Sequence, residues 1–443
     1  MSADVHARFA QFPLVSALLE RRSRRFARGM HLDGGPLAYR SEQPPQPLSL
    51  DEEAALAFAA CGVTDHVLAD LPYDSGGRPE AASGNIMCHF VGRTAPSGDA
   101  MHDCSVFVLN DGGAWLLRRS QDFPRSEVPS LVQAARQHRF AELYERVRVR
   151  VADRRPDPPR QMPFVAPFNK YSANVPGTTY FLPVVDLTWL FVNVMLTFFD
   201  EDFCMFVLDD HNGYEPAGLA AFAKSAGGHL MDDPGTGRVF TVSALESWMC
   251  EFCMIEQGGI LQNLGLASAA LGLGGFPHFA AHPFGWFEAL GFRMETVPQS
   301  KLLGLPPAAN DLPMPTPVGL ERDGTVLLRP FCPPYYRSIE EAVLAFVDYK
   351  YAKGTGTFRD GGSATAWKDG AAVQAGSPKY PDRAIAATVA YCDYVWRRYG
   401  RFPACGPFRT LIAYQAHHLD PAFYERFYRA EALTEAQRSH PAH

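Results

Sequence analysis

The spacing of apolar and polar residues predicts several elements in the first half of the chain. Residues 49–62, SLDEEAALAFAACG, begin with a serine, carry Glu52 three residues later and end in a glycine, which predicts a capped helix. Residues 104–110, CSVFVLN, predict a strand that a turn of Asp-Gly-Gly closes. Since this strand has little polarity on either side, we expect both of its faces to be covered. Residues 203–210, FCMFVLDD, predict a second strand.

The most apolar stretch, residues 180–199, has the length of a membrane span but not its composition. A span needs about 20 residues. This stretch contains Pro183, Asp186 and Asn193, and the acidic sequence DEDF follows it without basic flanking residues. Polar side chains are costly within a bilayer. We therefore expect a buried strand followed by a buried helix, in the core or at a subunit interface, and no membrane segment.

A third pattern predicts the longest helix of the chain. Ser243 and Glu246 have the spacing of a capping box, and the glycine-rich sequence LGLGG at residues 271–275 ends the pattern. The apolar positions at helical spacing are Leu245, Trp248, Phe252 and Ile255, continuing toward Leu266 and Leu271.

The remaining segments are assigned by proline content and periodicity. Residues 154–167, RRPDPPRQMPFVAP, contain too much proline for a helix and predict a linker. A strand is expected near residues 292–297. The end of the chain is predicted to be mainly helical, with helices at residues 338–351, 380–399 and 408–428.

Composition and charge narrow the class of protein. The chain has 443 residues, 47% of them hydrophobic and 20% charged, as in ordinary globular proteins. It carries 41 basic and 48 acidic residues, a net charge of −7, so a nucleic-acid partner is not expected. Nine scattered cysteines do not form a disulfide framework, and the first residues lack the pattern of a secretory signal. We expect a cytoplasmic protein with no membrane partner.

Three segments suggest ligand chemistry. Residues 21–25, RRSRR, concentrate guanidinium groups and a hydroxyl, which suits a phosphate, although an isolated arginine run is more simply a solvated helix end. Residues 95–99, APSGD, form a turn whose glycine allows a flat ligand to approach the backbone. Residues 258–275 carry small residues every three or four positions, so that another backbone can pack closely.

Taken in this order, the three segments resemble motifs of the nitroreductase superfamily of FMN flavoproteins. RRSRRF at residues 21–26 is similar to the phosphate-binding signature, and APSGDAMH at residues 95–102 to the flavin loop. GGILQNLGLASAALGLGG, residues 258–275, is the most specific likeness and resembles the long helix and glycine turn ahead of the flavin ring. The likeness extends from about residue 18 to residue 321 and is interrupted by an apparent insertion between about residues 152 and 243.

The resemblance implies an α+β fold with a central, mainly antiparallel sheet flanked by helices, in a homodimer that binds FMN. It implies a nitroreductase-like domain at residues 1–338, with an insertion at about 152–243, and a helical C-terminal extension at 339–443. The implied flavin site has four parts: Arg22, Ser23 and Arg25 at the phosphate and ribityl chain; Pro96, Ser97, Gly98, Asp99 and Met101 along the flavin; the backbone of Phe279 and Ala280 near the ring; and a late basic residue, Arg329 or Arg337.

This sequence departs from the family pattern at the ring. Asp99 stands where the family often has asparagine, and Met101 where it often has glutamine. Neither an ionised aspartate nor a methionine can donate a hydrogen bond. Residues 277–280, PHFA, replace a Glu-Gly pair, so that only backbone donors remain there.

The expected function is an FMN-dependent oxidoreductase that transfers a hydride between a reduced donor, NAD(P)H being one candidate, and a small organic substrate. One alternative is a substrate-specific dehydrogenase or oxidase that uses oxygen, and another is a flavin-binding protein without turnover. A third is a metal-dependent enzyme at His278 and His282, spaced i,i+4, although the leading interpretation needs no metal. Cys250 and Cys253 share one face of the predicted helix. This spacing has three interpretations: two packed core residues, a redox pair, or half of a metal site.

Overall fold

A seven-stranded antiparallel sheet forms the centre of the computed structural model, which describes residues 2–69, 84–279, 283–303, 305–362 and 365–442. The strand order is β12-β17-β8-β5-β6-β7, and β16 also pairs with β8. Every pairing in this sheet is antiparallel. Its strands are β5 (Cys104–Asn110), β6 (Gly113–Leu117), β7 (Arg148–Ala152), β8 (Thr179–Asp186), β12 (Gly274–His278), β16 (Phe408–Arg409) and β17 (Ala413–His417).

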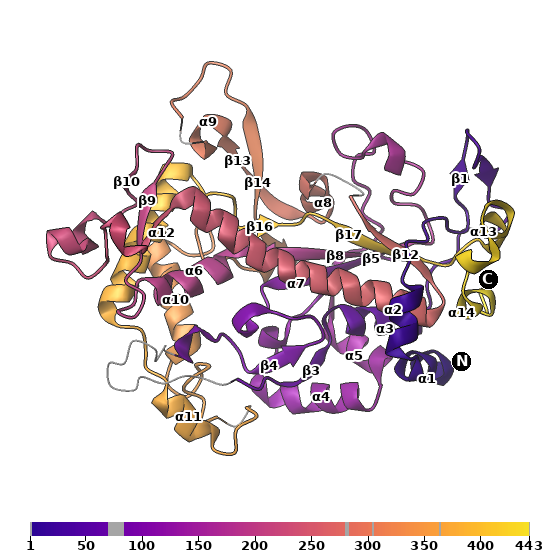
Figure 1. Cartoon of the computed structure of the whole chain (residues 1–443), viewed down its shortest axis with the longest axis horizontal. Coiled ribbons are helices and arrows are strands. Elements are labelled where there is room, and N and C mark those ends of the chain that lie inside the picture. The colour runs from indigo at the N-terminus through magenta and orange to yellow at the C-terminus, as the bar shows by residue number, and fades with distance from the viewer. Residues whose placement is uncertain (1, 70–83, 280–282, 304, 363–364, 443) are drawn as a thin grey trace.

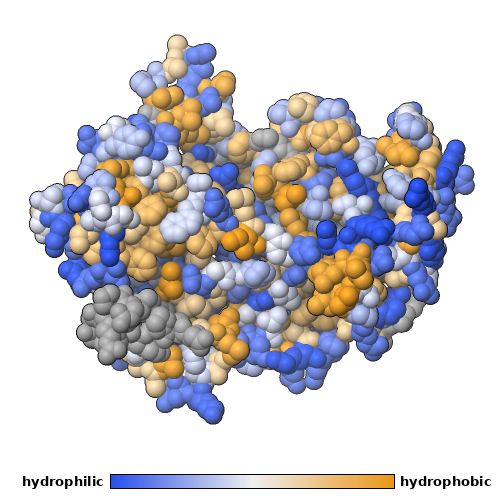
Figure 2. Space-filling model, in the orientation of Figure 1, coloured by the Kyte–Doolittle hydropathy of each residue, from blue (hydrophilic) through white to orange (hydrophobic). Residues whose placement is uncertain are grey.

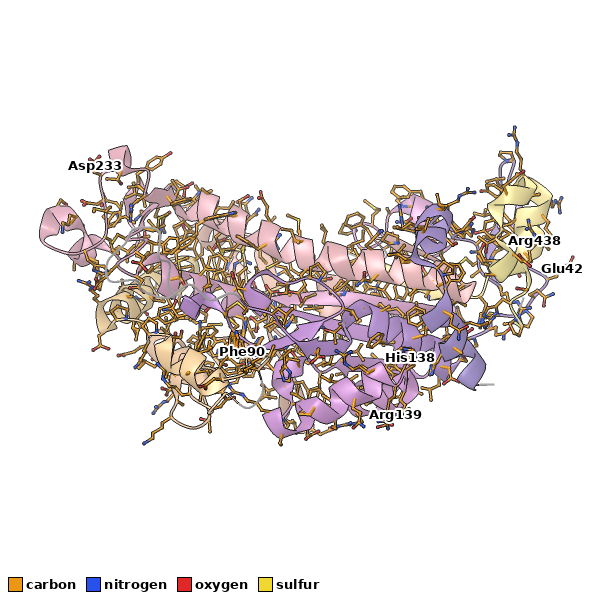
Figure 3. All side chains as sticks on the ribbon, turned by 60° about the horizontal axis from the view of Figure 1, so that its bottom comes forward. Glu42, Phe90, His138, Arg139, Asp233 and Arg438 are labelled. Atoms are coloured by element: carbon orange, nitrogen blue, oxygen red, sulfur yellow. The ribbon has the colours of Figure 1, made fainter. Side chains whose placement is uncertain are left out.

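Helices surround the sheet, and the longest of them, α7, lies across one of its faces (Figure 1). Figure 3 shows that α7 runs along the length of the molecule, from the side of Asp233 toward the side of Arg438. Both ends of the chain lie at the same end of the molecule (Figure 1). The helices are α1 (Ser2–Gln11), α2 (Leu14–Glu20), α3 (Leu50–Cys61), α4 (Val128–Arg136), α5 (Phe140–Val147), α6 (Leu187–Phe198), α7 (Val242–Leu271), α8 (Pro283–Ala289), α9 (Gln299–Leu302), α10 (Ile339–Tyr351), α11 (Gly370–Gly376), α12 (Asp382–Tyr399), α13 (Pro421–Phe427) and α14 (Glu435–Arg438).

Within the described parts of the chain, four smaller sheets lie outside the central one. Three of them pair only antiparallel strands, whereas β11 runs parallel to β9. Their strands are β1 (His31–Leu32) with β2 (Tyr39–Arg40), β3 (Val63–His66) with β4 (Val91–Arg93), β10 (Glu215–Pro216) with β9 (Phe206–Asp209) and β11 (Val239–Thr241), and β13 (Phe292–Pro298) with β14 (Pro313–Arg322) and β15 (Thr325–Leu328).

The central strands bury both of their faces, as the low polarity of residues 104–110 predicts. On β5, Val106 and Val108 pack into the larger core beneath α3, α6 and α7, whereas Phe107 and Leu109 pack into a second core with Trp286 of α8. This alternation follows from the two-residue period of a strand. The chain is therefore an α+β protein whose sheet separates two hydrophobic cores.

Several elements form as the sequence predicts. The capping box of Ser49 and Glu52 starts α3, and Gly62 follows its last residue. The apolar stretch at residues 180–199 folds into the buried strand β8 and the buried helix α6, which Asp186 caps by accepting a hydrogen bond from the Thr188 N–H. No helix among the described residues is long and apolar enough to cross a membrane.

The start and the buried face of α7 differ from the expectation. Thr241, not Ser243, caps the helix by accepting from the Ala244 N–H, and the carboxylate of Glu246 accepts from the Ala404 N–H instead. Trp248 and Ile255, two of the apolar positions at helical spacing, are 38% and 61% exposed. The buried residues of this half of the helix include Leu245, Met249, Cys253 and Ile260. Apolar residues occur all around α7, so their periodicity does not single out the face that packs on the sheet.

The helix expected at residues 408–428 of the C-terminal extension needs correction. Residues 408–428 form strands β16 and β17 and the short helix α13, not one helix. β17 lies between β12 and β8, inside the central sheet. Similarly, the segment 152–243, expected to be an insertion, supplies the central strand β8. All five residues of β17 are buried, because neighbours cover it on both sides and both faces.

Candidate functional site

The arginine cluster lies where α2 ends and the chain meets an edge of the central sheet. Arg24 forms an antiparallel bridge with Gly275 of β12, and its N–H donates to the Gly275 carbonyl at 3.3 Å. The Arg24 side chain points inward, where its Nε donates to the Ala432 carbonyl at 2.7 Å and burial lowers its pKa. Since successive side chains alternate along an extended segment, the neighbours Ser23 and Arg25 differ in direction from Arg24.

These residues line a cavity of about 380 Å³ at the end of the molecule that holds both termini. Guanidinium groups and aromatic rings form most of its wall. A backbone carbonyl holds the outermost arginine in place, because Arg22 Nη1 donates to the Glu431 oxygen at 2.9 Å. The lining residues are Arg22, Ser23, Arg24, Arg25, Phe26, Leu32, Leu37, Tyr171, Phe423, Tyr424, Tyr428 and Ala432. We call this space the arginine cavity.

Arg25 has the most constrained position in the arginine cavity. Its Nη2 donates to Asn169 Oδ1 at 2.6 Å, and its guanidinium carbon lies 4.6 Å from the centre of the Phe276 ring and 5.5 Å from that of Tyr171. Its Nε is buried and has no hydrogen-bond partner among the described residues. A buried donor without an acceptor is costly, so this atom suits an anionic or polar ligand.

Asn169 connects this arginine with another residue of the expected site. Its Nδ2 donates to the carbonyl of Phe279 at 3.0 Å, so one amide side chain holds Arg25 and the Phe279 backbone together. The sequence gives no signal for Asn169 or Tyr171, because both follow the proline-rich linker. Ala280 and His282 lie outside the described residues.

The expected flavin loop packs in a different place. Pro96 lies against Gly259 of α7, where a Cβ on the glycine would come within 2.5 Å of the proline ring. Ser97 Oγ accepts from the His102 N–H at 2.9 Å, and Gly98 lies beside Phe252. Among the described residues that line the arginine cavity, none comes from this loop. The two halves of the expected site are therefore not brought together in that cavity.

The end of the loop is held by a histidine. The Met101 side chain is buried, and its carbonyl accepts from His89 Nε2 at 3.0 Å. Asp99 has a φ of 50°, a backbone conformation that few residues other than glycine adopt. Burial raises the pKa of Asp99, against the opposing charge of Lys350.

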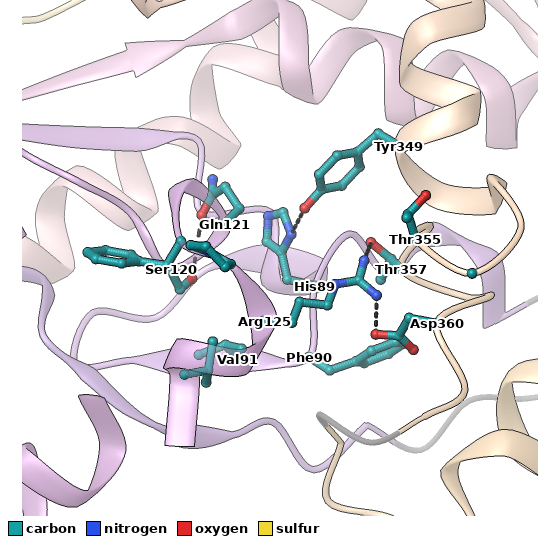
Figure 4. Close-up of a pocket in the computed structure, with 14 residues that line it drawn as sticks. His89, Phe90, Val91, Ser120, Gln121, Arg125, Tyr349, Thr355, Thr357 and Asp360 are labelled. Carbon is teal, nitrogen blue, oxygen red and sulfur yellow. Dashed lines mark hydrogen bonds and ion pairs between the residues drawn. The ribbon is translucent and has the colours of Figure 1, made fainter. Parts of the chain in front are cut away.

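His89 also lines a second cavity, of about 430 Å³ (Figure 4). A carbonyl can only accept, so Nε2 of His89 carries the proton and Nδ1 accepts from the Tyr349 hydroxyl at 2.6 Å. Burial lowers the pKa of His89 to about 3, which keeps the imidazole neutral. Arg125 in the same wall forms an ion pair with Asp360 (Figure 4). Because Asp360 already neutralises the charge of Arg125, this second cavity suits an anion less well than the arginine cavity does.

Arg329 lies apart from both cavities. Its Nη2 donates to the Tyr335 carbonyl at 3.0 Å, and its guanidinium lies over the Tyr336 ring. Arg337 forms an exposed ion pair with Glu341. Neither lines the arginine cavity as the structure describes it.

A buried cluster that the sequence does not reveal consists of Glu52, His418 and His440. Their nearest ligand-type atoms lie within 4.8 Å of one another, a geometry that could hold a metal ion. Hydrogen bonds already occupy the carboxylate, however, since Ser49 donates to it through its N–H at 2.7 Å and its hydroxyl at 2.8 Å. His440 Nε2 lies 2.8 Å from Glu52 Oε1, and His418 Nε2 lies 3.2 Å from Oε2. The cluster is thus satisfied by protein groups.

Comparison with known proteins adds little to this geometry. No family model and no curated protein matches the sequence. Among solved structures, a protein from Ralstonia eutropha JMP134 described as a "putative nitroreductase" matches with 15% sequence identity and a TM-score of 0.28. The match covers 63% of this chain and 76% of that one. A similarity of this size carries no argument about the family.

Proposed function

We propose that the chain binds FMN, with the phosphate in the arginine cavity, and acts as an oxidoreductase on a small organic substrate. The supporting observation is that Arg22, Ser23 and Arg25 line one cavity in which the Arg25 Nε is buried without a partner. Bound FMN supplies hydride transfer between a donor and an acceptor.

The residues of the cavity have separate tasks in this proposal. Arg25 is oriented before the ligand arrives, because Asn169 fixes one nitrogen and Phe276 supports the guanidinium plane. Its free Nε then donates to a phosphate oxygen, and the exposed Ser23 hydroxyl adds a short donor. Arg24 is a structural residue, since backbone carbonyls hold its guanidinium. The charge of Arg22 adds to the attraction for a dianion.

The first test compares FMN with riboflavin, which lacks the phosphate. Fluorescence titration of the full chain should show tighter binding of FMN. Arg25→Gln should weaken FMN binding at least tenfold, because a hydrogen bond to a charged group contributes about 1.5–3 kcal/mol, and should leave riboflavin binding nearly unchanged. Arg397→Gln on the exposed side of α12 is the matched control. Equal affinity for the two flavins would contradict a phosphate site.

The second test identifies the reaction. NADH and NADPH are added separately to the FMN-loaded protein without oxygen, and the visible spectrum is recorded. Bleaching by either donor supports the reductase. Bound flavin that neither donor reduces supports the oxygen-using dehydrogenase or oxidase, or the carrier without turnover, and oxygen uptake with candidate substrates separates these two.

We also propose that the chain forms a homodimer. Four apolar residues of α2 are exposed, Leu14 by 65%, Val15 by 67%, Leu18 by 50% and Leu19 by 73%. Figure 2 shows this helix as an orange patch on the surface. α2 packs on α7, whose Trp248, Phe252 and Ile255 are also partly exposed. Exposed apolar surface of this kind is typical of an interface between subunits.

The dimer is tested by mass measurement in solution. Leu18→Glu combined with Leu19→Glu should convert the dimer to a monomer, because each charge would be buried without a partner. Leu344→Glu changes an exposed leucine of α10 and should leave the dimer intact. A wild-type chain that is monomeric at micromolar concentration would contradict the proposal.

A further inference from the structure

Two thiols that are 155 positions apart in the sequence lie next to each other at the start of α7. The Cys405 thiol is close enough to that of Cys250 for each to shift the pKa of the other. A backbone contact confirms that the two segments meet, because the Ala404 N–H donates to the Glu246 carboxylate. Ala404 precedes one cysteine, and Glu246 lies one helical turn before the other, on the same side of α7.

The neighbouring cysteine of the sequence motif is engaged elsewhere. Cys253 is 4% exposed, and its thiol donates to Asp103 Oδ2 at 3.0 Å. Burial, together with the nearby carboxylate, raises its pKa. The C-x-x-C pattern of the sequence therefore does not identify the pair of thiols that meet, and the partner of Cys250 is found only in the fold.

The surroundings of Cys250 favour its thiolate. The hydrogen bond from Cys405, together with the charge and hydrogen bond of Arg409, lowers the pKa of Cys250 to about 6, although burial opposes this. The pKa of Cys405 is raised, since it is the donor of the pair and the thiolate of Cys250 lies beside it. Burial raises the pKa of Glu246 to about 7, and Arg401 contributes a second positive charge near this group.

Cys250 is also distinct from the other cysteines. All nine are free, and six of them are buried. The pKa is raised at each of the other eight. Cys250 and Cys405 are both partly exposed residues, unlike the six buried cysteines. A thiolate with a second thiol beside it is the arrangement found in redox-active cysteine pairs.

We propose that Cys250 and Cys405 form a reversible disulfide when the protein meets a hydroperoxide. The Cys250 thiolate attacks the terminal peroxide oxygen and the O–O bond breaks, which gives a sulfenic acid and an alcohol or water once the leaving oxygen takes a proton. The Cys405 sulfur then attacks the Cys250 sulfur, its proton leaves with the hydroxyl as water, and the S–S bond forms. One peroxide gains two electrons and the two thiols lose two.

The disulfide would fix α7 to the segment that leads into β16. A dithiol reductant restores the two thiols and is itself oxidised to a disulfide. This inference does not depend on FMN, because none of the groups that it uses lines the arginine cavity. The two proposals can therefore succeed or fail separately.

The test oxidises the full-length reduced protein with one equivalent of hydrogen peroxide and maps its peptides by mass spectrometry without reduction. We expect a cross-linked pair that contains Cys250 and Cys405, with a loss of two hydrogens that dithiothreitol reverses. Cys405→Ser should abolish the cross-link and leave a sulfenic acid on Cys250 that dimedone traps. Cys253→Ser is the matched control from the same helix and should retain the cross-link.

A second readout follows the reactivity of Cys250 itself. The rate of its alkylation by iodoacetamide should rise with a midpoint near pH 6, and this midpoint should move upward in Arg409→Gln and in Cys405→Ser. A cross-link between Cys250 and Cys253 would overturn the proposal. So would the absence of any cross-link combined with a midpoint above pH 8, the range of an ordinary thiol.

Discussion

Glu52 of α3 and Glu256 of α7 are both buried carboxyl groups on helices that pack against each other, yet they differ in charge. Glu52 accepts hydrogen bonds from Ser49, His418 and His440, which outweigh burial and hold its pKa well below the usual range. Around Glu256, burial and the neighbouring Asp103 raise the pKa to about 8, although Arg93 lies 3.6 Å away.

The difference shows that partners, more than burial, decide the charge of an acid in this core. Glu52 faces donors only, so its ionised form is favoured. Glu256 faces another acid and a single cation, so its own carboxyl group is mostly protonated near neutral pH. The first group holds the C-terminal segment through charge, and the second acts as a neutral hydrogen-bonding group beneath α7.

The largest effect is expected from Glu52→Gln. His418 Nδ1 lies 3.2 Å from the Gln46 carbonyl and Nε2 faces the carboxylate, so both nitrogens donate and the ring is positively charged. The amide would remove the negative charge that faces this buried ring, at a cost of about 3 kcal/mol. Urea unfolding at pH 7 measures the loss. Glu142→Gln on the exposed side of α5 is the control, and equal stability of the two variants would refute the ion pair.

The next effect is the opposite pH dependence of the two groups. The folded-state pKa of Glu52 lies below its ordinary value of 4.5. Its contribution to the free energy of unfolding is therefore present above pH 4.5 and is lost as the pH falls. The raised pKa of Glu256 has the reverse consequence. Its contribution to the free energy of unfolding is present below pH 4.5 and is lost as the pH rises through about 8.

Unfolding at a series of pH values tests this reversal. The stability difference between wild type and Glu52→Gln should shrink from pH 7 to pH 3, whereas wild type should lose stability relative to Glu256→Gln from pH 5 to pH 9. Glu251→Gln, on the exposed side of α7, should track wild type throughout. Parallel pH profiles for the two buried positions would contradict the assigned charges.

A smaller effect is expected from His440→Gln. Its Nδ1 accepts from the Ala442 N–H at 3.2 Å, so the ring is neutral and donates to Glu52 through Nε2 alone. Losing one such hydrogen bond costs about 1 kcal/mol. The free energy of unfolding should fall accordingly, and a loss as large as that of Glu52→Gln would show that His440 carries the charge instead.

The smallest effect is expected from Glu256→Gln at pH 5. The wild-type group is protonated there, and an amide of the same shape can still accept from the Cys104 N–H, which lies 3.3 Å from Oε1. Stability should change by less than about 1 kcal/mol. A larger loss in urea unfolding at this pH would mean that Glu256 is ionised and paired with Arg93.

Local patterns predicted much of the fold for a physical reason. The cap of α3 depends on Ser49 and Glu52, three positions apart, and the buried strand β8 shows in the apolar run that forms it. Predictions from local patterns were wrong where a helix has apolar residues on all sides, and where a strand pairs with segments that are distant in the sequence. The buried face of α7 could not be chosen because apolar residues surround that helix, and β17 was assigned to a helix because its neighbours in the sheet are remote in sequence.

The candidate site divides in the same way. The sequence predicted a phosphate site at Arg22, Ser23 and Arg25, because a run of neighbouring residues resembles a phosphate-binding signature. Only the tertiary structure shows that these residues line one cavity and that Asn169 orients Arg25 within it. The central sheet and the C-terminal segment bring them together. The proximity of Cys250 and Cys405 was also decided by the tertiary structure. Periodicity and caps record contacts within one element, whereas contacts between distant segments exist only once the strand order is fixed.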